Sequence, residues 1–237
     1  MLKEFAQYLA SVKENKTYEI GGQTYSDNDL VRIEKYTPHP TRITVAGLDS
    51  IVKVIRTEAK KLTAPIYIHV DSPDYVNAFT ALDGEMDRDY LVIAKSDVPG
   101  FRSGFTDYES AIIEFRSKFI PNKDIAYILD LLSRINMENG VTTTDNGVSQ
   151  SVEARKGISL KQMENIKPRV TLAPYRTFLE VEQPESEFLL RLDDNGRVGL
   201  FEADGGMWKL HAKQNIADYF SEEMKSEIAD GTVVVMI

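Results

Sequence analysis

The sequence predicts an α+β fold, in which a mixed strand–helix–strand unit and a helical hairpin are followed by a β-rich half closed by a C-terminal helix and strand. Three observations lead to this prediction. Apolar residues recur at helical spacing in several segments, short alternating runs typical of strands lie between and after them, and turns rich in Gly, Asn and Asp join neighbouring runs. No internal repeat or low-complexity tract is present.

The N-terminal residues 1–14 are predicted to form an amphipathic helix, because Leu2 and Phe5 begin an apolar stripe at helical spacing. Two short alternating runs follow, separated by Gly21 and Gly22. Two consecutive glycines supply the positive φ angles of a two-residue hairpin turn, so a hairpin is expected here.

A strand–helix–strand–strand–strand unit is predicted next. Its helix is indicated by a stripe that includes Leu48, Ile51 and Ile55, and its strands by alternation such as that around Ile66 and Ile68. The predicted segments are a strand at 42–45, a helix at 48–62, and strands at 65–70, 75–82 and 90–94.

A helical hairpin is predicted after this unit. Thr106 and Glu109 match a capping box, in which a Thr hydroxyl accepts from the amide three residues on. A helix is expected to run from there to Phe119, where Pro121 stops it, and a second helix is expected over 123–136. So short a link favours two antiparallel helices.

The last part of the chain is predicted to be mainly strand. Asp145-Asn146-Gly147 predicts a hairpin within 141–154, and further strands, a helix and a final strand follow. Gly205-Gly206 is expected to break the chain before the final helix. The remaining predicted segments are strands at 169–181, 187–192 and 198–202, a helix at 213–229 and a strand at 232–237. We expect segments 1–104, 105–139 and 140–237, or one continuous domain.

Composition limits the chemistry. The chain has no Cys, which excludes disulfides, thiolate metal sites and Cys nucleophiles. Its three histidines, His39, His69 and His211, lack the i, i+4 spacing of a helical zinc motif, and no catalytic motif is present. We therefore predict no catalytic residue, no metal site, no cofactor and no enzymatic activity. The net charge of −9 disfavours broad wrapping of nucleic acid.

Two charged segments leave alternatives open. The acidic run Asp83 to Asp89 reads as a solvated turn, although alternating carboxylates also bind hard cations. A basic stretch reads as a solvated loop, as an assembly contact, or as a groove for phosphates beside aromatic platforms for bases. The candidate phosphate-binding or nucleic-acid-binding residues of that stretch are Arg155, Lys156, Lys161 and Arg169.

The C-terminal segment carries the strongest sign of self-association. Residues 233–237 are all apolar, with no Lys or Pro to protect a strand edge. Such a strand is expected either inside its own sheet, buried on both faces, or at a subunit contact. Trp208, the single Trp, is likewise either core or an interface anchor. The candidate interface residues are Trp208, Val233, Val235 and Ile237.

Several segments together resemble the YfdQ-like family of phage and prophage proteins. The residues that carry this resemblance are Arg32–Tyr36 with Pro38, Pro40 and Arg42; the helix and strand after Gly47; Pro99–Arg102; Asp107; Phe115 and Phe119-Ile120; and Leu179–Val181. The resemblance covers most of the chain in order and character. It implies a virus-encoded protein, and because the family is uncharacterised it assigns no catalytic residue.

We therefore expect a non-enzymatic, phage-encoded homo-oligomer. An alternative is a nucleotide-binding or single-stranded nucleic-acid-binding accessory protein of phage replication or recombination. The N-terminus contains Glu4 and lacks the apolar run of a signal peptide, and no stretch is apolar enough to span a bilayer. A protein of the bacterial host cytoplasm with no membrane partner is therefore expected.

Overall fold

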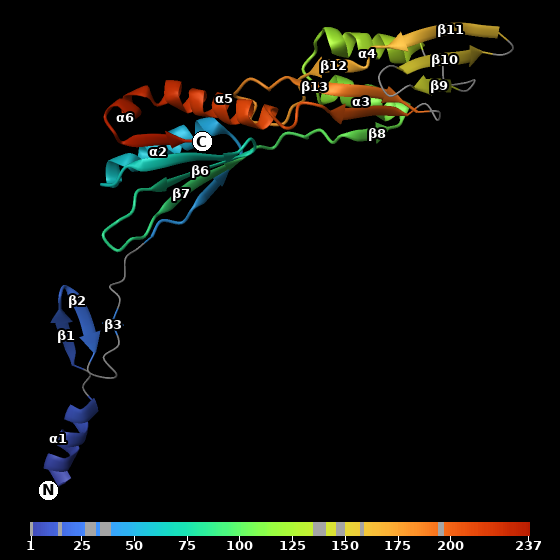
Figure 1. The fold of residues 1–237 in the computed structure, drawn as a ribbon. Coiled ribbons are helices and arrows are strands. Elements are labelled where there is room, and N and C mark those ends of the chain that lie inside the picture. Colours follow the sequence, from blue (N-terminus) through green and yellow to red (C-terminus); the bar gives the residue numbers. More distant parts are fainter. Residues whose placement is uncertain are drawn as a thin grey trace. The chain divides into compact units, whose positions relative to one another are not determined.

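The protein contains both helices and strands in separate stretches, which confirms the predicted α+β class (Figure 1). The chain divides into two compact units, Met1–Pro40 and Thr41–Ile237. The computed structural model describes residues 2–13, 16–26, 32–33, 39–134, 141–145, 150–156, 159–193 and 197–237. Among the described helices, none has both the length and the apolar character needed to cross a membrane.

The N-terminal unit holds one helix and a small antiparallel sheet in the order β1-β2-β3. Gly21 and Gly22 have φ angles of 63° and 78°, so the turn between β1 and β2 is the predicted two-residue hairpin. Leu2 and Phe5, from the apolar stripe of the helix, are exposed. The elements are α1 (Leu2–Lys13), β1 (Thr17–Ile20), β2 (Gln23–Ser26) and β3 (Arg32–Ile33).

The second unit contains a five-stranded sheet in the order β15-β5-β6-β7-β4. Its three central strands are antiparallel, whereas β15 runs parallel to β5 and β4 runs parallel to β7. The elements are β4 (Ile43–Val45), α2 (Leu48–Glu58), the short 3₁₀ helix η1 (Ala59–Lys61), β5 (Ile66–Ser72), β6 (Tyr75–Thr80), β7 (Tyr90–Lys95), α5 (Trp208–Glu223), α6 (Lys225–Ala229) and β15 (Val233–Met236).

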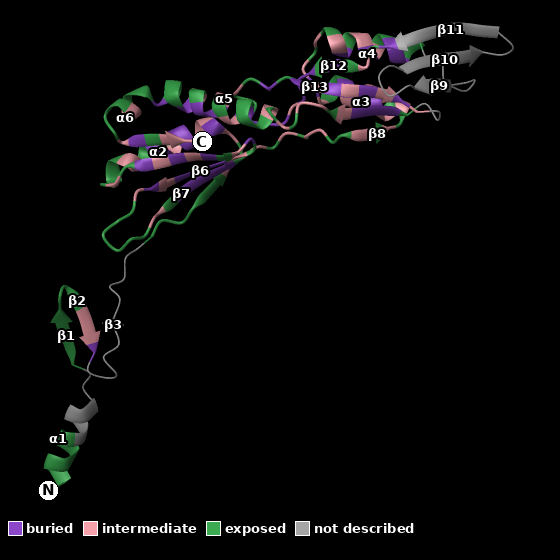
Figure 2. Ribbon diagram, viewed as in Figure 1, coloured by how far each residue is buried: buried purple, intermediate pink, exposed green. Residues whose placement is uncertain are grey.

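Helices cover one face of this sheet. The predicted stripe of α2, with Leu48 and Ile55, packs in one core with Ile66 and Ile68 of β5 and with Phe220 of α5. Side chains of β5 and β6 alternate between buried and half-buried along most of each strand (Figure 2). Alternation of this kind arises where one face of a sheet packs on a core and the other does not.

A four-stranded antiparallel sheet in the order β12-β13-β14-β8 packs with α3 and α4 around a second core. The two helices contact each other, as the helical-hairpin prediction requires. A further sheet has the order β11-β10-β9. The elements are β8 (Gly104–Thr106), α3 (Tyr108–Ser117), α4 (Lys123–Arg134), β9 (Val141–Asp145), β10 (Gln150–Lys156), β11 (Ser159–Ile166), β12 (Arg169–Leu172), β13 (Ser186–Leu192) and β14 (Val198–Glu202).

The capping prediction for α3 is wrong by one residue. Asp107, not Thr106, is the N-cap, and its carboxylate accepts from the backbone N–H of Ser110 at 3.0 Å. Thr106 instead ends β8, where it is paired with Val198. The sheet holds Thr106 in place, so the next acceptor along the chain caps the helix.

Replacing Asp107 with Ala is expected to lower the free energy of unfolding by about 1 kcal/mol, since a helix amide loses its acceptor. Thr106→Ala is the matched control and is expected to change it by less than about 0.5 kcal/mol. Urea unfolding followed by circular dichroism measures both. An effect at Thr106 equal to that at Asp107 would contradict the assignment of the cap.

Three other elements differ from the prediction. The strand expected over 169–181 stops at Leu172, and the chain then continues in irregular form past two prolines, Pro174 and Pro184. The basic stretch around Lys161, for which a solvated loop was one of the predicted alternatives, contains strand β11. The last helix begins at Trp208, earlier than expected, because the Asp204 carboxylate accepts from the backbone N–H of Trp208 at 3.2 Å. That helix is interrupted at Met224, which separates α5 from α6.

Some predicted features lie outside the described residues. They are residues 34–36 and Pro38 of the segment that carries the family resemblance, residues 146–147 of the hairpin turn, and the boundary at 139–140.

Candidate functional site

The C-terminal strand lies in the five-stranded sheet, at its edge. Val233 is 1% exposed and is paired with Ile66, whereas Val234 and Ile237 are 39% and 58% exposed. Val233 is buried, Val234 is exposed, and Val235 and Met236 are half-buried, so the expectation of burial on both faces is wrong. In the described part of the chain, β5 is the only strand paired with β15.

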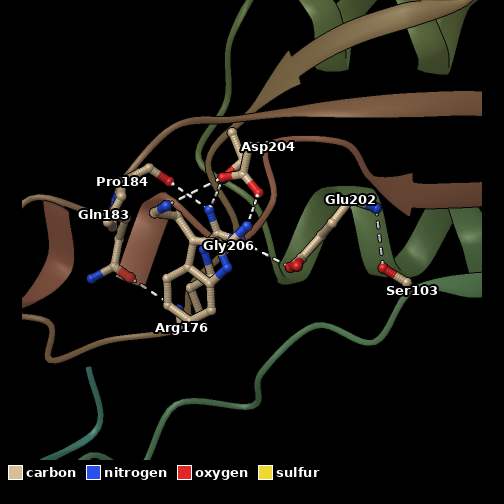
Figure 3. A network of polar contacts seen from close by, with 9 residues as sticks. Ser103, Arg176, Gln183, Pro184, Glu202, Asp204 and Gly206 are labelled. Carbon is tan, nitrogen blue, oxygen red and sulfur yellow. Dashed lines mark hydrogen bonds and ion pairs between the residues drawn. The ribbon is translucent and has the colours of Figure 1, made fainter. Parts of the chain in front are cut away.

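A polar network around Arg176 joins the irregular segment after β12 to the start of α5 (Figure 3). Arg176 is 8% exposed. Its guanidinium donates to Glu202 Oε1 at 3.1 Å, to the Pro184 carbonyl at 3.2 Å, and to the hydroxyl of Ser186. Ser186 in turn donates to Asp204 Oδ2 at 2.7 Å.

Gln183 holds the backbone of the same segment. Its side-chain oxygen accepts from the backbone N–H of Arg176 at 2.9 Å and of Thr177 at 3.1 Å. Its amide nitrogen donates to the Phe178 carbonyl at 2.8 Å. Side-chain bonds of this kind replace the ladder that a strand would provide, which explains how this buried segment remains irregular.

Burial controls the charge state of the network. Burial lowers the pKa of Arg176 to about 10, against the opposing effect of Glu202 and Asp204. Burial by itself raises the pKa of Asp204, but the hydrogen bond from Ser186 and the amides of Gly206 and Trp208 lower it below the usual value. Arg176 forms an ion pair with Glu202, and the hydrogen bonds to Asp204 favour its deprotonated carboxylate.

Trp208 belongs to this network. Its ring lies 3.9 Å from Arg176 Cζ, a cation–π contact, and the residue is half-buried. Among the described atoms, the buried Arg176 Nε and Trp208 Nε1 have no hydrogen-bond partner. The network pairs Arg176 with Glu202 and holds Asp204 by hydrogen bonds, so it links the segment after β12 to the start of α5.

The predicted basic residues are not placed equally well. Arg155 and Lys156 lie on β10 and Lys161 on the adjoining strand β11, and their side chains lie outside the described set. Arg169 lies on β12, where it forms an exposed ion pair with Glu187 at 2.6 Å. The described contacts therefore do not bring the four residues into one groove.

The acidic run forms the turn between β6 and β7. Asp83 Oδ1 accepts from the backbone N–H groups of Glu85 and Asp87 at 2.8 and 2.9 Å. Among the described residues, no group of three or more His, Cys, Asp or Glu side chains is arranged to hold a metal ion.

A row of aromatic side chains that was not predicted from the sequence crosses the five-stranded sheet. Tyr67, Phe79 and Tyr90 are direct cross-strand neighbours on β5, β6 and β7. The sequence of β5 already indicated a ring on this face. Tyr67 and His69 lie between the buried positions of the strand, where a solvent-facing strand commonly carries charged residues.

In comparisons with known proteins, no family model, no curated protein and no solved structure matches this chain.

Proposed function

We propose that the protein acts, without catalysis of its own, as a homo-oligomer whose subunits pair through β15. The open edge of this strand is the observation that carries the proposal. The carbonyl of Thr232 accepts from Ile66 N–H at 2.9 Å, so it points toward β5. Because alternate residues of a strand direct their backbone groups to opposite edges, Val233 and Val235 direct theirs to the open edge.

The side chains of this edge favour pairing with another strand. Residues 233–237 contain no Lys, Pro or acid, the residues that commonly protect edge strands. Val234 and Ile237 are exposed, and Val235 is half-buried. Exposed apolar groups beside unpaired backbone donors and acceptors favour addition of a further strand.

A two-fold axis would satisfy this edge with the same residues from both copies. Two β15 strands that meet antiparallel would join two five-stranded sheets into one continuous sheet. In such a contact Val233 remains in the core and supplies backbone groups, whereas Val234 and Ile237 supply side chains.

The biological setting is part of the proposal. The resemblance described above supports a phage-encoded protein of the bacterial host cytoplasm. The lack of Cys and of a recognised catalytic motif in the sequence supports a non-enzymatic role.

The substitution Val234→Lys tests the proposal. It places like charges near the axis and is expected to shift the mass in solution from a multiple of 26.8 kDa to that of one chain. Because Val234 is partly exposed, the free energy of unfolding of the folded chain is expected to change by less than about 0.5 kcal/mol. Light scattering after size-exclusion chromatography measures the mass.

Ile113→Lys on α3 is the matched control, since Ile113 is also exposed, at 64%. This variant is expected to keep the mass of the unmodified protein. A monomeric unmodified protein, or an unchanged mass for Val234→Lys, would refute pairing through β15.

A further inference from the structure

The aromatic row, defined as Tyr67, Phe79 and Tyr90, forms a continuous surface on the five-stranded sheet. The ring centroids of Tyr67 and Phe79 are 5.9 Å apart, and those of Phe79 and Tyr90 are 5.4 Å apart. These distances place neighbouring rings in direct contact. The row crosses three adjacent strands, so the sheet backbone sets the spacing of the rings.

The row lies on the face of the sheet opposite the helices. Ile66 and Ile68, which flank Tyr67, are fully buried under α2 and α5, as is Ala78 beside Phe79. Successive side chains of a strand point to opposite faces, so the aromatic row points away from that core. Tyr90 is 48% exposed.

Arg88 lies over the row. Its Cζ is 5.5 Å from the centroid of Tyr67 and 5.2 Å from that of Phe79, and its Nη1 donates to the Thr80 carbonyl at 3.1 Å. Together with Met236 of β15, these residues line a hollow of about 370 Å³. That volume lies within the range of roughly 300–1,000 Å³ typical of small-molecule sites.

Arg88 has no carboxylate partner among the described residues. The other two arginines that lie over aromatic rings in this part of the chain do have one, since Arg176 pairs with Glu202 and Arg197 pairs with Asp193. The neighbouring carboxylate of Asp87 accepts from the backbone N–H of Arg88 rather than from its guanidinium. A cation held on aromatic rings without a counter-ion favours an anionic ligand.

We infer that the aromatic row binds the bases of a nucleotide or a single-stranded nucleic acid, while Arg88 pairs with a phosphate. Aromatic side chains stack on bases of any nucleotide sequence, and neighbouring aromatic rings on one face of a sheet suit such stacking. The inference uses the face of the sheet, whereas pairing through β15 uses its edge; Met236 of β15 lines the hollow, and Val234 is paired with Tyr67. It also places the binding site away from Arg155 and Lys156.

Fluorescence anisotropy with a short fluorescein-labelled oligothymidylate at low salt tests the inference. Phe79→Leu is expected to weaken binding about 5-fold to 150-fold, the loss that corresponds to one stacked base. Arg88→Gln is expected to reduce the magnitude of the slope of log K against log salt by about 0.7, the contribution of one phosphate contact in a single strand. Phe79→Tyr, which keeps the ring, is expected to retain binding.

Phe105→Leu is the matched control. Phe105 is 44% exposed, and its ring centroid lies 5.4 Å from that of Phe201. Arg197 lies over the Phe105 ring, but this arginine is already paired with Asp193. This variant is expected to bind the oligonucleotide like the unmodified protein. Should Phe79→Leu fail to fold by circular dichroism, Tyr90→Leu at the more exposed end of the row replaces it.

Competition with AMP distinguishes the two sources of the ligand. Displacement of the oligonucleotide by AMP at comparable concentration supports a nucleotide site, and displacement only by unlabelled strand supports a single-strand site. The inference is overturned if neither ligand binds at low salt, or if binding falls with Arg155→Gln and Lys156→Gln but not with Phe79→Leu. It is also overturned if Phe79→Leu lowers the mass in solution, because a second copy would then cover this face.

Discussion

Deletion of residues 233–237 is expected to destabilise the folded protein by roughly 3–6 kcal/mol, a large part of the stability of a typical domain. Val233 is 1% exposed and packs in the core of the five-stranded sheet, and Val235 packs against the same core. The deletion removes both side chains and uncovers the edge of β5, whose Ile66 and Ile68 are fully buried in the intact protein. Strand hydrogen bonds to β5 are lost with them.

Urea unfolding measures the stability of this deletion, and light scattering measures its mass. The variant Val234→Lys is the reference that keeps the strand but blocks its edge, so the two effects can be separated. A deletion that stays equally stable and of unchanged mass would show that β15 contributes neither to the core nor to assembly. Loss of stability in a protein that is monomeric at full length would support the core role and remove the proposal of assembly.

Replacing Arg176 with Met is expected to cost roughly 1–3 kcal/mol, because the buried Pro184 carbonyl and the Ser186 hydroxyl lose a charged donor. Arg176 neutralises Glu202, donates to the Pro184 carbonyl and supports the ring of Trp208. Without the guanidinium, the Pro184 carbonyl loses a buried donor and the Trp208 ring loses its cation. Arg176→Lys keeps the charge but loses the planar fork, so an intermediate cost is expected.

Arg169→Met is the matched control, because Arg169 also pairs with a glutamate in the same sheet. The side chains of Arg169 and Glu187 are 61% and 41% exposed, so this substitution is expected to cost at most about 1 kcal/mol. Thermal and urea unfolding measure both variants. Equal effects at the two positions would show that the Arg176 network contributes no more than a surface ion pair.

Local patterns determined much of the fold. The turn at Gly21 and Gly22 follows from two residues that adopt positive φ without strain, and the stripe of α2 follows from the helical repeat. Strand β5 was found from alternation, which depends only on neighbouring residues. Each of these signals lies within the element it forms.

Side-chain hydrogen bonds decided the elements that were predicted wrongly. The segment after Leu172 stays irregular because Gln183 and Arg176 satisfy its backbone with side chains. Helix α5 begins at Trp208 because Asp204, which is also bound by Ser186 of β13, accepts its amide. No periodic pattern encodes such hydrogen bonds, since they depend on the placement of single polar side chains and not on which face of an element is apolar.

The sequence by itself determined the α+β class, most of the strands and helices of the five-stranded sheet, and a C-terminal strand that belongs in a sheet. Only the tertiary structure decided that β15 lies at the edge beside β5, and that Tyr67, Phe79 and Tyr90 meet beneath Arg88. The physical reason is that periodicity reports which face of an element is apolar, whereas strand order and the meeting of side chains are set by packing between segments far apart in the chain.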